Sequence, residues 1–237
     1  MKRVFSTMVT VVVCLGLAAL SLASSGGSGL GADEALTKLK EGNGRYVAGA
    51  TVAPHQDAAR RHETATGGQH PFATVLSCAD SRVPVEVVFD QGVGDIFVVR
   101  VAGNVAAVDE IGTMEYGAEH LGVPLIVVLA HTKCGAVTAV VKNEPVTENI
   151  GQLVAPIVPA VKAVKARFAS DSLDDVINKS IEANMWQAIS DIYAKSPMLK
   201  QMAAAGKVKV VGALYDIDSG QVRWFGEHPS QANLLAK

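Results

Sequence analysis

Two short segments of the chain carry residue types that can bind a metal ion and activate water. Cys78-Ala79-Asp80-Ser81-Arg82 combines a thiol, a carboxylate and a guanidinium, and His131-Thr132-Lys133-Cys134-Gly135 adds an imidazole and a second thiol. Two thiolates and one imidazole can hold a tetrahedral zinc ion and leave its fourth position to water. The residue types therefore predict a metal-dependent hydrolytic or hydrating enzyme.

The two charged residues of the first segment can assist such a centre. Asp80 and Arg82 follow Cys78 at intervals of two residues, so in an extended or turn geometry their side chains point the same way. Asp80 can then bind the ion as a fourth ligand or accept a hydrogen bond from its water, and Arg82 can hold Asp80 through a charge-assisted pair. The alternative is a surface ion pair, which contributes only ~0–1 kcal/mol.

Both segments follow apolar runs that are typical of strands buried on two faces. Helical periods separate these runs, which favours parallel pairing and right-handed crossovers. We predict an α/β protein with a mainly parallel β-sheet, about four parallel strands plus one antiparallel edge strand, flanked by helices and preceded by an N-terminal helical arm. The predicted strands are residues 72–77, 96–101, 125–130, 208–214 and, antiparallel, 221–225. In such sheets ligands gather at the carboxyl ends of the strands, where both segments fall.

The predicted helices cover residues 33–46, 111–121, 136–141, 150–168, 172–192 and 198–205, the last expected to end the helical part of the chain. Pro156 and Pro159 are expected to bend or restart the fourth helix, since proline lacks an amide hydrogen. Cys134 precedes the third, and a helix N-terminus favours the thiolate form. Gly135 is expected to let the backbone turn tightly beside the metal.

The bulk composition limits the classes of partner. A net charge of -2 over 237 residues and an aromatic content of 5% give no reason to expect a nucleic-acid partner. The first residues have the pattern of a secretory signal. Lys2 and Arg3 precede an apolar stretch, and small residues follow from Ala23.

We therefore predict a signal peptide over residues 1–23, a flexible linker over 24–32 and a single catalytic domain over 33–237. The expected location is the periplasm. An uncleaved anchor is the alternative, because the apolar stretch nearly spans a ~30 Å membrane core. Membrane contact is expected only through that segment.

A disulfide is the competing interpretation of the cysteines. Cys14 lies within the apolar segment, which leaves Cys78 and Cys134 as an even pair, and exported proteins often join such pairs. The protein would then be a non-catalytic periplasmic module. That interpretation leaves His131, Asp80 and Arg82 unexplained, and metal content distinguishes the two.

The two segments resemble the signatures of the β-class carbonic anhydrases, Cys-x-Asp-Ser-Arg and His-x-x-Cys-Gly. The resemblance extends from about residue 35 to 225. It includes three further motifs: Gly42-Asn43-Gly44-Arg45-Tyr46, Phe97-Val98-Val99-Arg100 with Ala102-Gly103-Asn104, and Gly212-Ala213-Leu214-Tyr215-Asp216.

The resemblance implies one zinc ion (Zn2+) per subunit, held by Cys78, His131 and Cys134. It further implies that zinc-bound hydroxide attacks carbon dioxide to give bicarbonate and a proton. Asp80 orients the hydroxide, and Arg82 keeps Asp80 off the metal. Close relatives hydrolyse carbonyl sulfide or carbon disulfide with the same metal set, so this activity is the alternative.

The resemblance also implies a substrate pocket shared between subunits. Gln69 matches a residue that donates to the substrate oxygen, and Phe97 and Tyr116 match apolar pocket positions. In the family these three come from the neighbouring subunit, so we expect a homodimer or a dimer of dimers. Ala102 and Gly135 are assigned to the same pocket.

Overall fold

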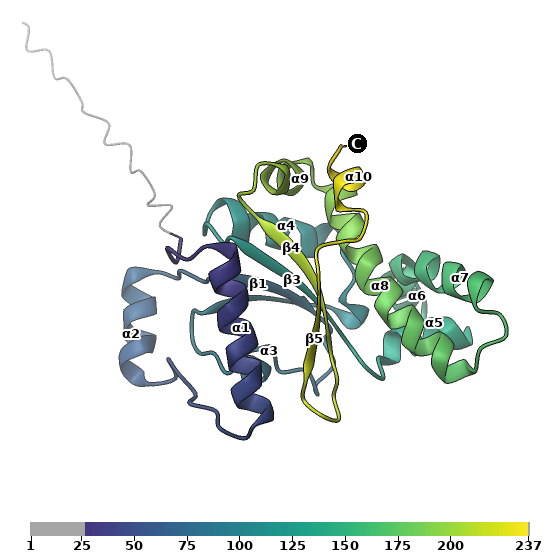
Figure 1. Cartoon of the computed structure of the whole chain (residues 1–237), viewed down its shortest axis with the longest axis horizontal. Coiled ribbons are helices and arrows are strands. Elements are labelled where there is room, and N and C mark those ends of the chain that lie inside the picture. Colours follow the sequence, from purple (N-terminus) through teal and green to yellow (C-terminus); the bar gives the residue numbers. More distant parts are fainter. Residues whose placement is uncertain (1–26, 237) are drawn as a thin grey trace, which may run out of the picture.

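A single sheet of five strands organises the protein, for which a computed structural model describes residues 27–236 (Figure 1). The strand order is β2-β1-β3-β4-β5. The first four strands run parallel, and β5 pairs with β4 in the antiparallel sense. The strands are β1 (Ala73–Ser77), β2 (Ile96–Arg100), β3 (Leu125–His131), β4 (Lys209–Tyr215) and β5 (Val222–Gly226). The predicted fold class is confirmed, and each predicted strand agrees within one or two residues.

Helices cover both faces of this sheet. They are α1 (Ala32–Val47), α2 (Ala58–Gly67), α3 (Val85–Val88), α4 (Val108–Glu119), α5 (Gly135–Lys142), α6 (Glu148–Val154), α7 (Val158–Arg167), α8 (Leu173–Lys195), α9 (Pro197–Ala204) and α10 (Gln231–Ala236), with short 3-10 turns η1 (Ala102–Asn104) and η2 (Ala155–Ile157). The predicted helix over 150–168 is divided into α6, η2 and α7 because Pro156 and Pro159 lack the amide hydrogens that a continuous helix needs.

Three short helical elements were not predicted. The turns α3 and η1 are too brief to show a helical period in the sequence. The expectation that residues 198–205 form the last helix was wrong, since α10 follows β5. Its six residues bury no side chain fully, so the sequence carries no strong apolar pattern there.

Alternate residues of the strands supply two separate cores. Val75 and Val127 belong to the face covered by α1 and α3, which also buries Leu39 and Phe89. Leu76, Val128 and their neighbours face the opposite side, where α4, α5, α7 and α8 pack. This division follows from the two-residue repeat of a strand. It explains why the strand segments are apolar at nearly every position.

The N-terminal helix α1 packs against β1 and β3 of the sheet, whereas α2 lies farther from the sheet (Figure 1). The buried Asn43 side chain donates to the carbonyl oxygens of Val88 and Gly220 and accepts from the amide of Val222. One side chain therefore ties α1 to α3 and to the β4–β5 hairpin. Helix α2 buries no residue fully.

The predicted signal peptide and the first residues of the predicted linker lie outside the described residues. Within residues 27–236, no helix has both the length and the apolarity that a membrane crossing requires.

Candidate metal centre

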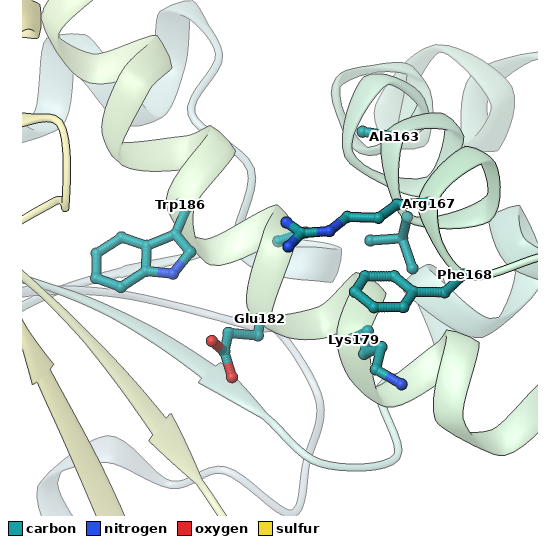
Figure 2. A pocket seen from close by; sticks show the side chains of 8 residues that line it. Ala163, Arg167, Phe168, Lys179, Glu182 and Trp186 are labelled. Carbon is teal, nitrogen blue, oxygen red and sulfur yellow. The ribbon is translucent and has the colours of Figure 1, made fainter. Parts of the chain in front are cut away.

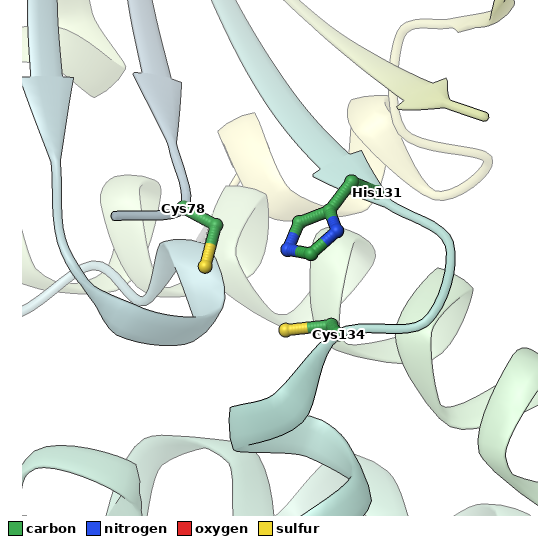
Figure 3. Close-up of side chains that lie close together, drawn as sticks. All are labelled: Cys78, His131 and Cys134. Carbon is green, nitrogen blue, oxygen red and sulfur yellow. The ribbon is translucent and has the colours of Figure 1, made fainter. Parts of the chain in front are cut away.

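The carboxyl ends of β1 and β3 bring Cys78 and His131 together. These strands are neighbours, with Ser77 paired to Leu129, so Cys78, directly after β1, lies beside the end of β3, where His131 is the last residue. Cys134 is the N-cap residue of α5. Figure 3 shows the three side chains converging on one point from a strand end, a second strand end and a helix start.

The three ligand atoms are close and shielded from water. Cys78 Sγ, one His131 ring nitrogen and Cys134 Sγ all lie within 4.8 Å of one another. Ligands of a single tetrahedral zinc ion lie roughly 4 Å apart, since Zn–S and Zn–N bonds are ~2.0–2.3 Å long. The three residues are 4%, 0% and 1% exposed, respectively. The geometry therefore suits one shared ion.

The His131 ring has a defined orientation and tautomer. Its Nδ1 lies 2.9 Å from the carbonyl oxygen of Thr132. Because a carbonyl oxygen can only accept, Nδ1 must carry the hydrogen. The other nitrogen, Nε2, is buried and has no hydrogen-bond partner among the described residues. A buried nitrogen lone pair without a hydrogen-bond partner is available to bind a metal ion, while the other ring nitrogen fixes the ring through its own hydrogen bond.

The two thiols are unequal. Both cysteines are free, and the Cys134 thiol donates to Cys78. This hydrogen bond, together with the one from the Gly103 amide, lowers the pKa of Cys78 although burial opposes the shift. The same contact with Cys78, together with burial, raises the pKa of Cys134. A divalent cation bound by both sulfurs would displace their protons, because such a metal is held by thiolates.

Asp80 stands at the edge of this cluster, held by Arg82. Arg82 donates from Nε and Nη2 to the two carboxylate oxygens and from its backbone amide to Oδ1. The hydrogen bonds from Arg82 hold the pKa of Asp80 well below its usual range. Asp80 Oδ2 is 3.9 Å from His131 Nε2, so the ionised carboxylate lies next to the cluster but outside the group of three converging ligands.

Arg82 also reaches the second segment. Its Nη2 lies 3.2 Å from the carbonyl oxygen of Lys133, between the ligands His131 and Cys134. The tight turn there is made by Lys133, whose φ is +57°. The expectation that Gly135 makes this turn was wrong, because Gly135 does not have a positive φ. A Cβ built on Gly135 would meet nothing within 4 Å.

Three supporting contacts were missed by the sequence analysis. The Gly103 amide lies 3.3 Å from Cys78 Sγ. Arg100 donates to the carbonyl oxygens of Cys78 and Asp80, at 3.1 and 2.7 Å. Both residues belong to motifs that carry the family resemblance, which was the only signal available. Each contact involves a backbone atom on one side, the Gly103 amide or the carbonyl oxygens that Arg100 meets, and no sequence pattern records such contacts.

Three other predicted site residues gather elsewhere. Gln69 and Tyr116 line a groove of about 430 Å³ that also includes His70 and His120, and the Phe97 ring lies 6.1 Å from the Tyr116 ring. Phe97 pairs with Thr74 near the start of β1, whereas Cys78 follows the end of that strand. Within one chain this group therefore lies beside the edge strand β2 and not among the metal ligands. Ala102, in contrast, opens η1, which contacts β1 and β3 near the ligands.

Another groove lies between α7 and α8 (Figure 2). Its volume is about 500 Å³, and Phe168 lies between the cations of Arg167 and Lys179. Lys179 is paired with Asp171, and Glu182 with Arg223. None of the residues lining the groove is a cysteine or histidine. This groove therefore lacks the metal-binding and nucleophilic groups that converge at the strand ends.

Comparisons with known proteins agree on one family. The carbonic anhydrase family model matches residues 73–222. Carbonic anhydrase 2 of Mycobacterium tuberculosis (strain H37Rv) is 38% identical over 183 residues, which cover 77% of this chain and 87% of that protein. A carbonic anhydrase of Mycolicibacterium smegmatis is 37% identical and covers 78% and 88%.

Solved structures agree with this result. The β-carbonic anhydrase CafA of Aspergillus fumigatus superimposes with a TM-score of 0.68 at 26% identity, covering 86% of this chain and 94% of that one. The β-carbonic anhydrase of Coccomyxa, solved in complex with acetazolamide, gives 0.64 at 26% identity and covers 71% and 78%.

Proposed function

The chain belongs to the β-class carbonic anhydrases, and from this premise we propose that it catalyses the reversible hydration of carbon dioxide at a zinc centre. In the overall reaction, one water adds to carbon dioxide to give bicarbonate and one proton. The ligands are Cys78, His131 and Cys134, with one zinc ion per subunit.

The convergence of these three side chains carries the proposal. Their ligand atoms lie within 4.8 Å of one another, and the buried Nε2 of His131 has no hydrogen-bond partner in the part of the chain that the structure describes. A zinc ion bound there supplies a Lewis acid that makes water nucleophilic near neutral pH. The ring orientation needed for this is maintained by the hydrogen bond from Nδ1 to the Thr132 carbonyl oxygen.

Asp80 and Arg82 orient the attacking water. The Asp80 carboxylate is an acceptor at neutral pH, because Arg82 favours its ionised form. Since Arg82 occupies one side of both carboxylate oxygens, the remaining lone pairs are available to the water. By the same contact Arg82 keeps Asp80 from closing onto the metal. Arg82 is therefore a positioning residue for Asp80.

We further propose that the active unit is a homodimer or a dimer of dimers. Gln69, Phe97 and Tyr116 gather beside β2, an edge strand of the sheet, away from the metal ligands of their own chain. Tyr116 is 48% exposed, so it is available to a second subunit. In this arrangement each subunit contributes these three side chains to the carbon dioxide pocket of the other subunit. There they lie next to the Ala102 and Gly135 that belong to the same chain as the metal ligands.

The deciding experiment is stopped-flow hydration of carbon dioxide across pH, on protein whose zinc content has been measured. We expect turnover that scales with zinc content, is lost on chelation and returns on addition of zinc. Zinc-loaded protein without hydration activity would reject the proposal.

Two alternatives are tested by the same preparation. A hydrolase of carbonyl sulfide or carbon disulfide would turn over the sulfur compound faster than carbon dioxide. A non-catalytic module with a Cys78–Cys134 disulfide would contain no zinc and no titratable thiol in these two positions. The free, buried state of both cysteines supports the zinc centre over the disulfide.

We propose export to the periplasm through a signal peptide over residues 1–23. The basic start, apolar stretch and small residues that follow support this proposal. Mass spectrometry of exported material is expected to give a mature chain that begins at Ser24. A chain retaining the apolar segment would indicate an anchor.

A further inference from the structure

A buried amide on helix α8 contacts the loop beside the first metal ligand. Asn184 is 2% exposed, and its Nδ2 donates to the carbonyl oxygen of Gly103 at 2.7 Å. The backbone amide of the same Gly103 lies 3.3 Å from Cys78 Sγ. Two consecutive hydrogen bonds therefore connect the middle of α8 to a sulfur atom of the metal centre, and the first of them joins residues 81 positions apart in the sequence.

Gly103 needs such an anchor because its conformation is demanding. Its φ of +75° is one that side-chain-bearing residues rarely adopt. A Cβ at this position would lie 2.7 Å from Ile157 Cδ1 and 3.2 Å from Ala136 Cβ. Glycine is thus required, yet glycine is also the residue with the most backbone freedom to lose. A hydrogen bond to its carbonyl oxygen restricts that freedom and directs the amide at the thiolate.

The position of Asn184 on α8 is otherwise unsuitable for an amide. The buried residues one turn away on α8 are mostly apolar: Ile181 and Ala188 are 1% and 2% exposed, and Ser180 is the polar exception. An amide buried among such residues is unfavourable unless it is hydrogen-bonded. The Gly103 carbonyl oxygen provides that partner. The unfavourable burial of the Asn184 amide is therefore offset by its hydrogen bond to the loop beside the metal centre.

We propose that Asn184 is a positioning residue for the metal centre, which holds the Gly103 amide against the Cys78 thiolate. This inference rests on the proposed zinc site and goes beyond it by assigning a role to a residue on a helix that carries no ligand. An amide that donates to a coordinating thiolate stabilises its charge and its orientation, as outer contacts do for other metal ligands.

The test compares Asn184→Leu with a control on the same helix. The leucine keeps the approximate volume and removes the donor. Ser180→Ala is the control, because Ser180 is fully buried one turn earlier and its hydroxyl has no hydrogen-bond partner within residues 27–236. We expect zinc to leave Asn184→Leu about 10-fold faster than the wild type in a chelator competition, the lower end of the range for outer-contact changes. Ser180→Ala should match the wild type.

A spectroscopic measurement separates this role from simple packing. In protein loaded with cadmium-113, the Gly103 amide proton should show a scalar coupling to the metal through the thiolate hydrogen bond, and Asn184→Leu should lose it. Should Asn184→Leu not fold, Asn184→Asp keeps the side-chain shape and replaces the donor with an oxygen, so the same losses are expected.

Wild-type zinc release and an unchanged coupling in a folded Asn184 variant would overturn the inference. Absence of the coupling in the wild type would do the same. These results differ from a failure of the proposed function, in which the wild type itself would bind no zinc.

Discussion

Arg82 donates to both oxygens of Asp80, from Nε to Oδ1 at 2.9 Å and from Nη2 to Oδ2 at 2.7 Å. The planar guanidinium matches the carboxylate in this two-point contact, which fixes the orientation of the carboxylate as well as its charge. Because Arg82 also reaches the Lys133 carbonyl oxygen, the orientation of Asp80 is tied to both ligand segments.

The first prediction concerns Asp80. Asp80→Asn replaces one acceptor oxygen with a donor, so the attacking water loses its orientation while the three ligands stay. We expect kcat/KM for hydration to fall about 100-fold, the lower end of the range for a positioned acid–base group, with zinc content unchanged. Asp218→Asn, at an exposed position of the β4–β5 hairpin, is the control. Wild-type turnover in Asp80→Asn would remove the residue from the mechanism.

The second prediction concerns the metal ligands. Cys134→Ala removes one of three protein ligands, so zinc affinity should fall by more than the ~100-fold upper range for outer-contact changes, and activity should be lost with the metal. Thr138→Ala is a matched control, since the Thr138 hydroxyl donates to the backbone carbonyl oxygen of Cys134 and not to its thiol. Zinc content by elemental analysis and thiol titration check the result. Retention of zinc at wild-type affinity in Cys134→Ala would contradict the ligand assignment.

The third prediction tests the shared pocket. A His131→Ala chain lacks the metal centre, and a Gln69→Ala chain lacks the side chain that it would contribute to the pocket of the other subunit. If Gln69 acts across subunits, a mixed dimer has one site with both defects and one site with neither. We expect purified mixed dimers to recover about half the wild-type activity, as two equivalent sites require.

The readout is hydration activity of mixed dimers isolated through two different affinity tags, with each parent dimer as the control. Mixed dimers no more active than the average of the two parents would place Gln69 in the site of its own chain. A monomeric wild type in sedimentation would contradict the shared pocket directly.

The fourth prediction separates two glycines. Gly103→Ala must place a side chain at a φ of +75° and against Ile157, so we expect a loss of at least about 1–2 kcal/mol in unfolding free energy, with weaker zinc binding. Gly112→Ala lies on an exposed position of α4 with nothing within 4 Å of the new Cβ. It should stabilise the protein by about 0.5–1 kcal/mol. Denaturant unfolding measures both, and equal effects would contradict the assigned strain.

The fifth prediction concerns pH and Asp90, which is not a metal ligand. Burial opposes the ionisation of Asp90, but hydrogen bonds from Arg45, Val52 and Ala53 outweigh it and hold the pKa of Asp90 below its usual value. A carboxylate with a lowered pKa stabilises the fold above the unfolded-state pKa of ~3.9. This contribution is lost as pH falls through the lower folded-state value.

Asp90→Asn should therefore cost about 1–3 kcal/mol at pH 7, the range for hydrogen bonds to a charged group. The difference from the wild type should shrink below pH ~4. Urea unfolding across pH measures this, with Asp218→Asn as the control. A difference that is constant across pH would show that the charge of Asp90 contributes nothing.

The positions of the metal ligands at the ends of strands could be predicted from the sequence. Cys78 and His131 each follow or end an apolar run, and parallel strands bring their carboxyl ends to one edge. Cys134 could be placed beside them because it directly precedes a helical period. Asp80 and Arg82 lie in the same short turn, so their pairing is a local property of the sequence.

Other features depended on contacts that sequence does not record. The turn at Lys133 was assigned to Gly135, because a glycine is the usual carrier of a positive φ, whereas here the surrounding hydrogen bonds impose it on a lysine. Asn184 was not singled out within the helix predicted over residues 172–192, although an amide among mostly apolar helix positions was a usable signal.

The amino-acid sequence by itself determined which strands end at the ligand segments, which side chains can bind the metal, and the two-residue spacing of Cys78, Asp80 and Arg82. These features follow from local periodicity and side-chain character. Only the tertiary structure decided which backbone atoms support the ligands and where Gln69, Phe97 and Tyr116 lie relative to the metal ligands. Those relationships join segments distant along the chain: the backbone contacts of the ligands depend on the packing of α8 and η1 against the sheet, and the place of Tyr116 and Phe97 depends on the packing of α4 against β1 and β2.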